Sequence, residues 1–287
     1  MKRSFRSFLG IDLGGGRGKT TAVAELRTLP AGEGPPRVAV FEVAVRSGQR
    51  PWTDDTLFER LSEPVAARVI ALNAPLSSPA CGRCTRPVCP GVEACEEPAV
   101  AWLRTTGRAL VQGVAQETVG GRPSARVAGR VSLPVVQARL APYAHRVTDV
   151  VMTYKRGLLP PSSLGATHGA VAARAGHLEK RLRGAGYRVH ENLIEVSPAA
   201  TVAALCGVKD ARGYKRDADP WRTRALILER LGDLSFAPQS RMAREEVLGN
   251  DHCFDAVMSA YTAYLWARDG WEAPTAELAD DGWIYAP

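Results

Sequence analysis

The sequence lacks any long apolar run. No stretch of its 287 residues approaches the 18 consecutive apolar residues that a membrane-spanning helix needs. The N-terminus is basic, but Asp12 interrupts the short apolar run at residues 9–11, so no secretory signal is expected. Internal repeats and low-complexity tracts are also missing. With 45% hydrophobic and 23% charged residues, the composition predicts a globular cytoplasmic protein without membrane contact, and it indicates no particular protein partner.

Acidic residues are scarce in the middle of the chain. Residues 101–190 hold fourteen Lys or Arg residues and only three acids, whereas residues 251–287 hold one Arg and seven acids, within a total net charge of +7. A basic segment of this density favours a polyanionic partner such as nucleic acid, because neutralising phosphates releases counterions. The alternative is an Arg-rich face that is simply solvated.

The hydrophobic pattern predicts an α/β protein. Residues 7–13, 20–26, 37–45, 68–74 and 187–196 are strand-like, and a short terminal strand is expected at 283–285. Helical patterns cover residues 54–61, 98–114, 168–184, 198–205, 221–231 and 251–266. We expect a mixed five-stranded sheet flanked by helices. Residues 1–75 and 146–287 would form this core, with the helical cap in the second part, and residues 76–145 would be a Cys-rich, basic insertion.

Four cysteines are the sharpest motif in the chain. They follow the spacing C-x2-C-x4-C-x5-C, and in a cytosolic protein such a cluster is more typical of metal ligands than of disulfides. Four thiolates can hold zinc tetrahedrally or bind a 4Fe–4S cluster, and the spacing does not decide between them. Four reduced or redox-active thiols are the alternative. The cysteines are Cys81, Cys84, Cys89 and Cys95.

A Gly-rich segment, Gly14 to Thr20, resembles a phosphate-binding loop. That motif requires a glycine at position 13, where the chain has Leu13, and it must open into a helix, whereas a strand is expected here. A hairpin is therefore the better interpretation. Arg17 and Lys19 remain well placed to contact a phosphate near Asp12.

Carboxylates follow predicted strands and begin the last helix. Asp12 and Glu195 end two strands, and Asp251 and Asp255 lie one helical turn apart. Carboxylates gathered in this way are what two Mg²⁺ or Mn²⁺ ions need to assist phosphodiester hydrolysis. Taken singly, each acid has a structural explanation as a turn former or helix cap.

The chain is similar to domain-of-unknown-function family 429, which is described as predicted nucleases with an RNase H-like fold. The resemblance rests on short motifs in the same order over nearly the full length, namely Gly10-Ile11-Asp12, Asn73-Ala74-Pro75, Arg146-Val147-Thr148-Asp149, Glu195-Val196-Ser197-Pro198, Gly213-Tyr214-Lys215 and Asp251-His252-Cys253-Phe254-Asp255-Ala256. The cysteine cluster is an insertion between the second and third motifs.

The resemblance implies roles for individual residues. Asp12, Glu195 and Asp255 would bind magnesium, with Asp251 as a further ligand or support and His252 activating water. Arg17, Lys19, Arg146 and Lys215 would contact phosphate. At Asn73 an RNase H-type site would carry its second carboxylate, and an amide there should lower metal affinity because it adds no charge.

Three functions are therefore considered. The first is a metal-dependent nuclease, and the second is a weakly active or inactive nucleic-acid-binding protein with a structural metal loop. The third is an ATP-binding protein of the actin-like ATPase superfamily, which would require a second copy of the core.

Overall fold

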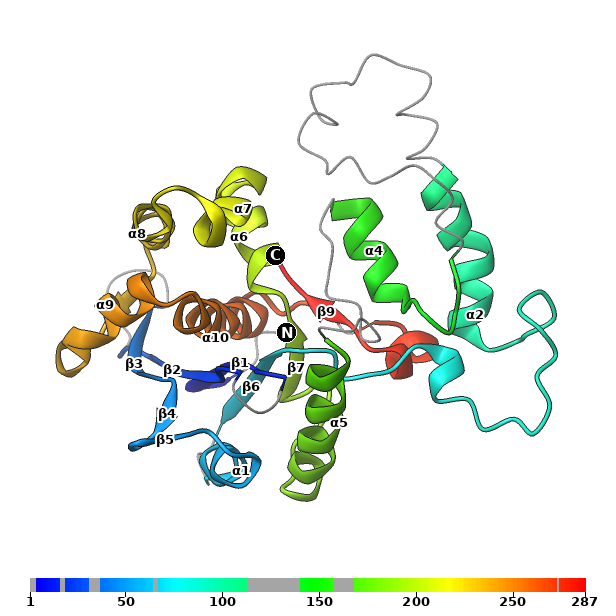
Figure 1. Ribbon diagram of the computed structural model, residues 1–287, viewed down its shortest axis with the longest axis horizontal. Coiled ribbons are helices and arrows are strands. Elements are labelled where there is room, and N and C mark those ends of the chain that lie inside the picture. Colours follow the sequence, from blue (N-terminus) through cyan, green and yellow to red (C-terminus); the bar gives the residue numbers. More distant parts are fainter. Residues whose placement is uncertain are drawn as a thin grey trace, which may run out of the picture.

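The computed structural model describes residues 4–15, 19–30, 37–63, 67–112, 140–156, 168–272 and 274–287 (Figure 1). Among these residues, no helix has the length and apolar character to span a membrane. The strands are β1 (Ser7–Asp12), β2 (Ala22–Thr28), β3 (Val38–Ala44), β4 (Arg46–Ser47), β5 (Arg50–Pro51), β6 (Arg68–Asn73), β7 (Leu193–Val196), β8 (Leu234–Phe236) and β9 (Ile284–Tyr285). The helices are α1 (Asp54–Ser62), α2 (Pro98–Trp102), α4 (Val147–Arg156), α5 (Gly169–Gly184), α6 (Pro198–Cys206), α7 (Val208–Arg216), α8 (Pro220–Arg230), α9 (Arg241–Gly249) and α10 (Asp251–Asp269).

The main sheet has the strand order β8-β3-β2-β1-β6-β7-β9. Strands β1, β2 and β3 form an antiparallel meander, and β6, β7 and β9 run parallel to β1. The mixed sheet is confirmed, but it has seven strands instead of the expected five core strands. The additional edge strands, β8 and β9, are three and two residues long, too short for a periodic signal, although a terminal strand near β9 was expected.

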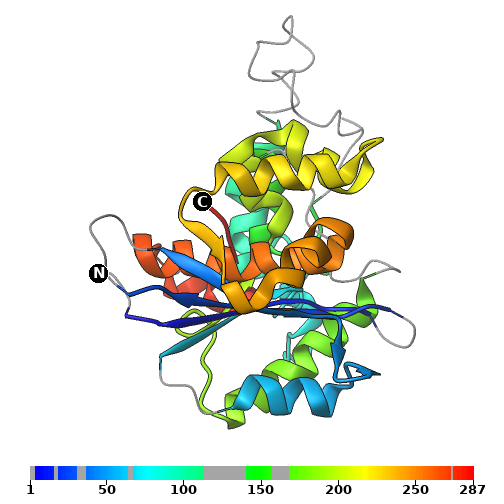
Figure 2. The same ribbon diagram turned by 90° about the vertical axis from the view of Figure 1, so that its left-hand side faces the viewer.

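Helices cover both faces of the sheet (Figure 2). On one face α10 crosses β1, β2 and β6, and its residues from Cys253 to Ala267 are buried. On the other face α1 and α5 pack against the sheet through an apolar cluster that includes Ile11, Leu57 and Leu178. Alternate residues of each strand therefore point to different helices, and this alternation decides which polar side chains can meet.

Gly10 lets α10 pack directly on β1. A Cβ atom at this position would lie 2.0 Å from the Ala256 carbonyl oxygen and 2.3 Å from the Ala260 nitrogen. The two backbones could not approach so closely with any other residue at this position. This contact fixes the first turns of α10 over the end of β1, where Asp12 lies.

The segment after β1 is a hairpin connection, as expected. Strand β2 pairs antiparallel with β1, with Asp12 opposite Ala22, and no helix opens after the glycines. Residues 16–18, including Arg17, lie outside the described residues, and the Lys19 side chain is exposed.

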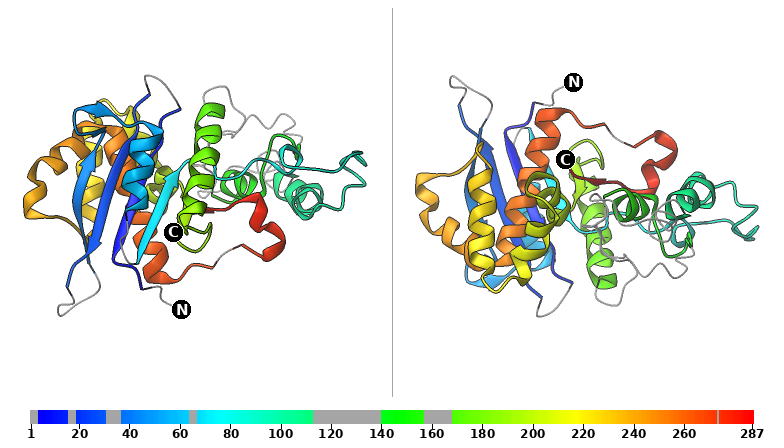
Figure 3. Two further views of the ribbon diagram at one scale, coloured as in Figure 1. Left: turned by 90° about the horizontal axis from the view of Figure 1, so that it is seen from below. Right: turned by 90° about the horizontal axis from the view of Figure 1, so that it is seen from above.

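Beyond β6 the chain leaves the sheet before it returns at β7. Helix α4 packs on the helical segment Leu103–Gly107, which continues α2, and an apolar cluster of Val100, Leu103, Val147 and Val150 joins these elements. We call the part formed by residues 76–112 and 140–156 the outer lobe. Figure 3 shows it, with the cysteine segment, residues 81–95, at its far end. Helix α4 thus shares one apolar cluster with α2 and, through Met152, a second one with Ala200 of α6 and Ile284 of β9.

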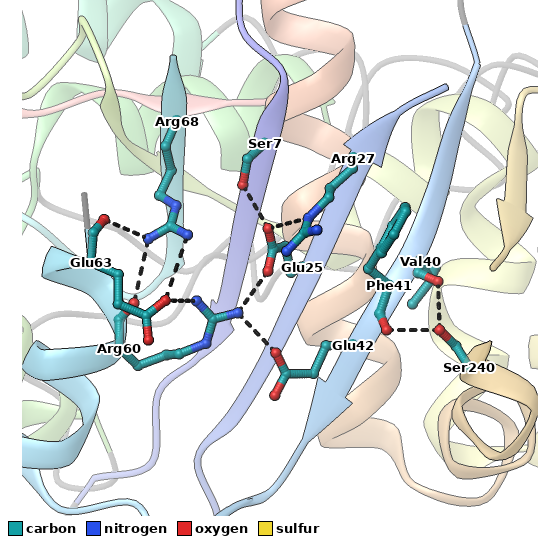
Figure 4. A network of polar contacts seen from close by, with 10 residues as sticks. All are labelled: Ser7, Glu25, Arg27, Val40, Phe41, Glu42, Arg60, Glu63, Arg68 and Ser240. Carbon is teal, nitrogen blue, oxygen red and sulfur yellow. Dashed lines mark hydrogen bonds and ion pairs between the residues drawn. The ribbon is translucent and has the colours of Figure 1, made fainter. Parts of the chain in front are cut away.

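A polar network joins α1 to the sheet (Figure 4). Glu25 on β2 is 1% exposed and accepts hydrogen bonds from Ser7 Oγ (3.0 Å), Arg27 Nε (2.7 Å) and Arg60 Nη2 (2.7 Å). Arg60 also bonds Glu42 at 2.8 Å. Burial on its own would raise the pKa of Glu25, but the hydrogen bonds and charges of the two arginines outweigh it and lower the pKa to about 2.

This network predicts an acid dependence of stability. Because the folded-state pKa of Glu25 lies below the ordinary value of 4.5, its contribution is complete above pH 4.5 and is lost as the pH falls toward 2. The shift corresponds to about 3 kcal/mol. We expect urea unfolding to show a shallower loss of stability between pH 6 and pH 3 for Glu25→Gln than for the wild type. Identical pH profiles would contradict this assignment.

Candidate functional site

The candidate site lies where β1 and β6 end beneath the start of α10. Asp12 is the last residue of β1 and pairs in register with Asn73, the last residue of β6, so both side chains point to the α10 face. Asn250 caps α10 by accepting a hydrogen bond from the His252 N–H at 2.9 Å. The cap and the close contact at Gly10 place His252 and Asp255 over the strand ends.

Asp12 is held from two sides. Asn73 Nδ2 donates to its Oδ1 at 2.8 Å, and His252 Nδ1 lies 2.6 Å from its Oδ2. Asn73 is thus a hydrogen-bond donor that orients Asp12. The hydrogen bond with Asp12 raises the pKa of His252, whose side chain is 40% exposed. An Asp–His pair of this kind can hold or transfer a proton at the other imidazole nitrogen.

Asp255 is the most deeply buried carboxylate of the site, at 1% exposure. Tyr214 donates its hydroxyl to Oδ1 at 2.8 Å, and Lys215 Nζ lies 2.5 Å from Oδ2. Burial and the nearby charge of Asp12 raise the pKa of Asp255 well above its ordinary value, against the effect of Lys215.

Lys215 lies among three carboxylates. Its Nζ is 3.9 Å from Asp251 Oδ2, in addition to its contact with Asp255. Burial alone would lower the pKa of Lys215, but the charges of Asp255, Asp12 and Asp251 raise it. Lys215 therefore remains a cation, and it partly neutralises the negative charge of the site. The sequence assigned no role to Tyr214, although it belongs to the Gly213-Tyr214-Lys215 motif, and helix α7 brings it to Asp255 together with Lys215.

Glu195 does not join this cluster. It pairs in register with Leu72, not Asn73, so its side chain leaves the sheet on the face opposite to Asp12. Its oxygens accept from Arg146 Nη1 and Nη2, both at 2.8 Å, and from the Leu76 N–H at 2.9 Å. The expected placement of Glu195 beside Asp12 is therefore corrected.

Arg146 also departs from its expected role of contacting phosphate. Its side chain is fully buried and bonds Asp149 as well as Glu195, with 2.8 Å from Nη2 to Asp149 Oδ1. These carboxylates raise the pKa of Arg146 despite its burial. The three side chains form a buried ion cluster that fixes the outer lobe to the end of β7.

The oxygen ligands that a divalent cation would need are partly assembled. Asp12, Asp251 and Asp255 supply hard oxygen donors suited to Mg²⁺ or Mn²⁺. Within the described ranges, no three His, Cys, Asp or Glu side chains are arranged so that they could hold one ion as they stand. A cation at this site would have to take over the interactions that Asp255 makes with Lys215.

The four cysteines lie in the outer lobe and not among the residues of this site. All are free thiols; Cys81, Cys84 and Cys89 are exposed, and Cys95 is partly buried. The Gly91 N–H donates to Cys89 Sγ at 3.4 Å. The other two cysteines, Cys206 and Cys253, lie on α6 and α10 as packing residues.

The Asp12–His252 pair predicts a measurable titration. Because the pKa of His252 is raised in the folded protein, its contribution to stability is complete below about pH 6.5 and is lost as the pH rises through the raised value. We expect the imidazole resonances of His252, followed by NMR in metal-free protein, to titrate at a lower pH in Asp12→Asn than in the wild type. An unchanged midpoint would show that the 2.6 Å contact does not hold in solution.

Comparison with known proteins places these residues within one family. The model of the family described as "Protein of unknown function (DUF429)" matches residues 10–277. No curated protein and no solved structure matches the chain. The matched range contains every residue of the site from Asp12 to Asp255. The chain therefore belongs to the DUF429 family.

Proposed function

We propose that this protein hydrolyses phosphodiester bonds in nucleic acid with the help of a divalent cation. The observation that carries the proposal is the meeting of Asp12, His252, Asp255 and Lys215 at the end of β1. Two carboxylates, a proton-transferring imidazole and a cation next to each other suit the hydrolysis of an anionic ester. The meander β1–β3 followed by parallel β6 and β7 supports the RNase H-like fold that the resemblance implies.

The roles follow from the contacts. Asp12 and Asp255 would hold Mg²⁺ or Mn²⁺ with Asp251 beside them, and the ion would orient the phosphate and acidify an attacking water. His252, held by Asp12, would accept the proton of that water at Nε2 while the new P–O bond forms. The ester P–O bond would then break, and the departing oxygen would take up a proton from solvent, to which His252 later returns the one it accepted. Lys215, released from Asp255, would pair with the phosphate.

Asn73 and Glu195 are assigned to positioning. Asn73 fixes the rotamer of Asp12, and Glu195 holds the backbone of Leu76, three residues after Asn73. Neither would need to touch the substrate.

A nucleic-acid-binding protein without hydrolytic activity is the second candidate. Each carboxylate oxygen of Asp12 and Asp255 already has a hydrogen-bond partner, and this closed network favours it. The basic segment supports both candidates only weakly, because part of it is not described and several of its arginines are already paired with acids. Residues 113–139 lie outside the described ranges, and Arg174, Arg181 and Arg183 pair with acids. The ATP-binding alternative needs a second copy of the core, whereas the described residues form one seven-stranded and one two-stranded sheet.

The two candidates separate in one assay. Labelled single-stranded, duplex and branched DNA and RNA are incubated with the full chain in Mg²⁺, in Mn²⁺ and in chelator. The proposal expects cleavage of at least one substrate that stops in chelator. Salt-sensitive binding without cleavage in either metal would overturn the hydrolase and leave the binding protein.

A further inference from the structure

The cysteine segment is held at both ends by hydrogen bonds but has no hydrophobic core of its own. Apart from a short 3₁₀ turn at Ala80–Gly82, residues 81–95 form no helix or strand, and most of their side chains are exposed. Of this segment, Val92 and Cys95 pack on the apolar cluster of the outer lobe. An ordered loop of this length loses much conformational entropy and gains little burial in return, so a crosslink is the usual way to stabilise it.

Two arginines hold the ends of the segment. Arg83 donates to the Ser78 carbonyl at 3.2 Å and to Asp281 Oδ1 at 2.8 Å. Arg104 Nη1 donates to three carbonyl oxygens, those of Val92 (2.8 Å), Glu93 (2.8 Å) and Cys95 (3.0 Å). These contacts position the first and last cysteines, whereas the backbone between them is not held by these two arginines.

The thiols share one electrostatic environment. Cys84, Cys89 and Cys95 all lie near enough to Cys81 to interact with it electrostatically. Gly91, at a φ of +84°, turns its N–H toward Cys89 Sγ, and N–H donors of this kind stabilise a metal-bound thiolate. A bound cation would reverse the mutual repulsion of the thiolates.

We propose that Cys81, Cys84, Cys89 and Cys95 bind one thiophilic metal centre, either zinc or an iron–sulfur cluster, around which the segment closes. Each thiol would lose its proton to solvent on binding. Closure is required because the described thiols do not yet converge on one point. The proposal is independent of the hydrolase at the end of β1.

The metal centre would strengthen the attachment of the outer lobe to the sheet. Arg83 lies between two of the cysteines and bonds Asp281, which accepts from the Val147 N–H at the start of α4. The neighbouring Arg146 bonds Glu195 at the end of β7. A metal that fixes Arg83 would therefore strengthen a continuous set of contacts from the loop to the sheet.

The test is the metal content of the full chain, purified without oxygen. We expect about one zinc per chain, or about four irons with matching sulfide and a brown colour. In Cys84→Ser and Cys89→Ser the content should fall at least about tenfold, whereas the control Cys206→Ser on α6 should keep it.

Hydrogen exchange on the wild-type chain makes the test independent of whether the variants fold. Removing the metal should speed exchange in residues 83–97 and at the start of α4, and leave α10 unchanged. The proposal is overturned if the chain carries no metal and takes up none when supplied with Zn²⁺ or with iron and sulfide. Equal metal in the serine variants, or exchange that does not respond to the metal, would overturn it too.

Discussion

Replacing Gly10 with alanine is expected to destabilise the protein by at least about 3 kcal/mol. The new Cβ would lie 2.0 Å from a backbone oxygen of α10, and backbone atoms cannot rotate away as a flexible side chain can. Strand β1 and helix α10 would have to separate, and Asp12 would then lose its contact with His252. Urea unfolding measures the loss directly.

Gly176 provides the matched control for this substitution. It lies within α5, and nothing is within 4 Å of the Cβ that alanine would add. Gly176→Ala should therefore be neutral or stabilise by up to about 1 kcal/mol, because alanine favours the helix. A Gly10→Ala protein as stable as Gly176→Ala would show that α10 does not pack on β1 as described.

Replacing Arg146 with methionine is expected to cost about 3 to 5 kcal/mol. Methionine fills similar space but leaves the carboxylates of Glu195 and Asp149, 4% and 8% exposed, without their buried cation. Uncompensated buried charge is more costly than the loss of the hydrogen bonds themselves. The difference in the free energy of unfolding between Arg146→Met and the wild type at neutral pH measures this cost.

Arg108→Met is the control on the same lobe. Arg108 bonds Glu93 at the surface, where both side chains are largely exposed, so its loss should cost less than about 1 kcal/mol. Equal stabilities for the two variants would show that the Arg146 cluster is not a buried support. Arg146 would then be free to contact a phosphate, as the family resemblance implies.

The parts of the fold with strong periodicity could be predicted from sequence. The five core strands, the hairpin after β1 and helix α10 were recovered because their apolar patterns are long. Helices α4, α7 and α9 and strands β4, β5 and β8 were missed. Strand β8 is only three residues long, and α9 lies in a charged segment at the edge of the fold.

The site could be predicted only in part, because residue types do not show which face a side chain takes. Asp12 contacts Asn73 and His252, and Asp255 lies near enough to Asp12 to feel its charge, while the roles assigned to these residues stay predictions. Glu195 points to the opposite face of the sheet. This orientation could not be predicted, because all four residues of β7 are buried and no polar alternation marks its two faces. Only the register with Leu72 reveals it.

The roles of the basic residues depended on contacts that are distant in sequence. Arg146 precedes its local partner Asp149 by three residues, but its pairing with Glu195 spans 49 positions. Lys215 reaches Asp255 across 40 positions through the packing of α7 near α10. Such pairs follow from the tertiary fold and leave no spacing pattern in the chain.

The most direct test of the proposed hydrolase is the cleavage rate of Asp12→Asn beside that of Asp55→Asn in Mn²⁺. Asp55 is an exposed acid of α1, on the opposite face, where it bonds Arg181 at 2.8 Å. We expect Asp12→Asn to lose cleavage by about 1,000-fold or more while nucleic-acid binding persists, because the variant lacks both the metal ligand and the anion that holds His252. Asp55→Asn should cleave like the wild type. Equal cleavage rates in the two variants would contradict a hydrolytic site at the end of β1.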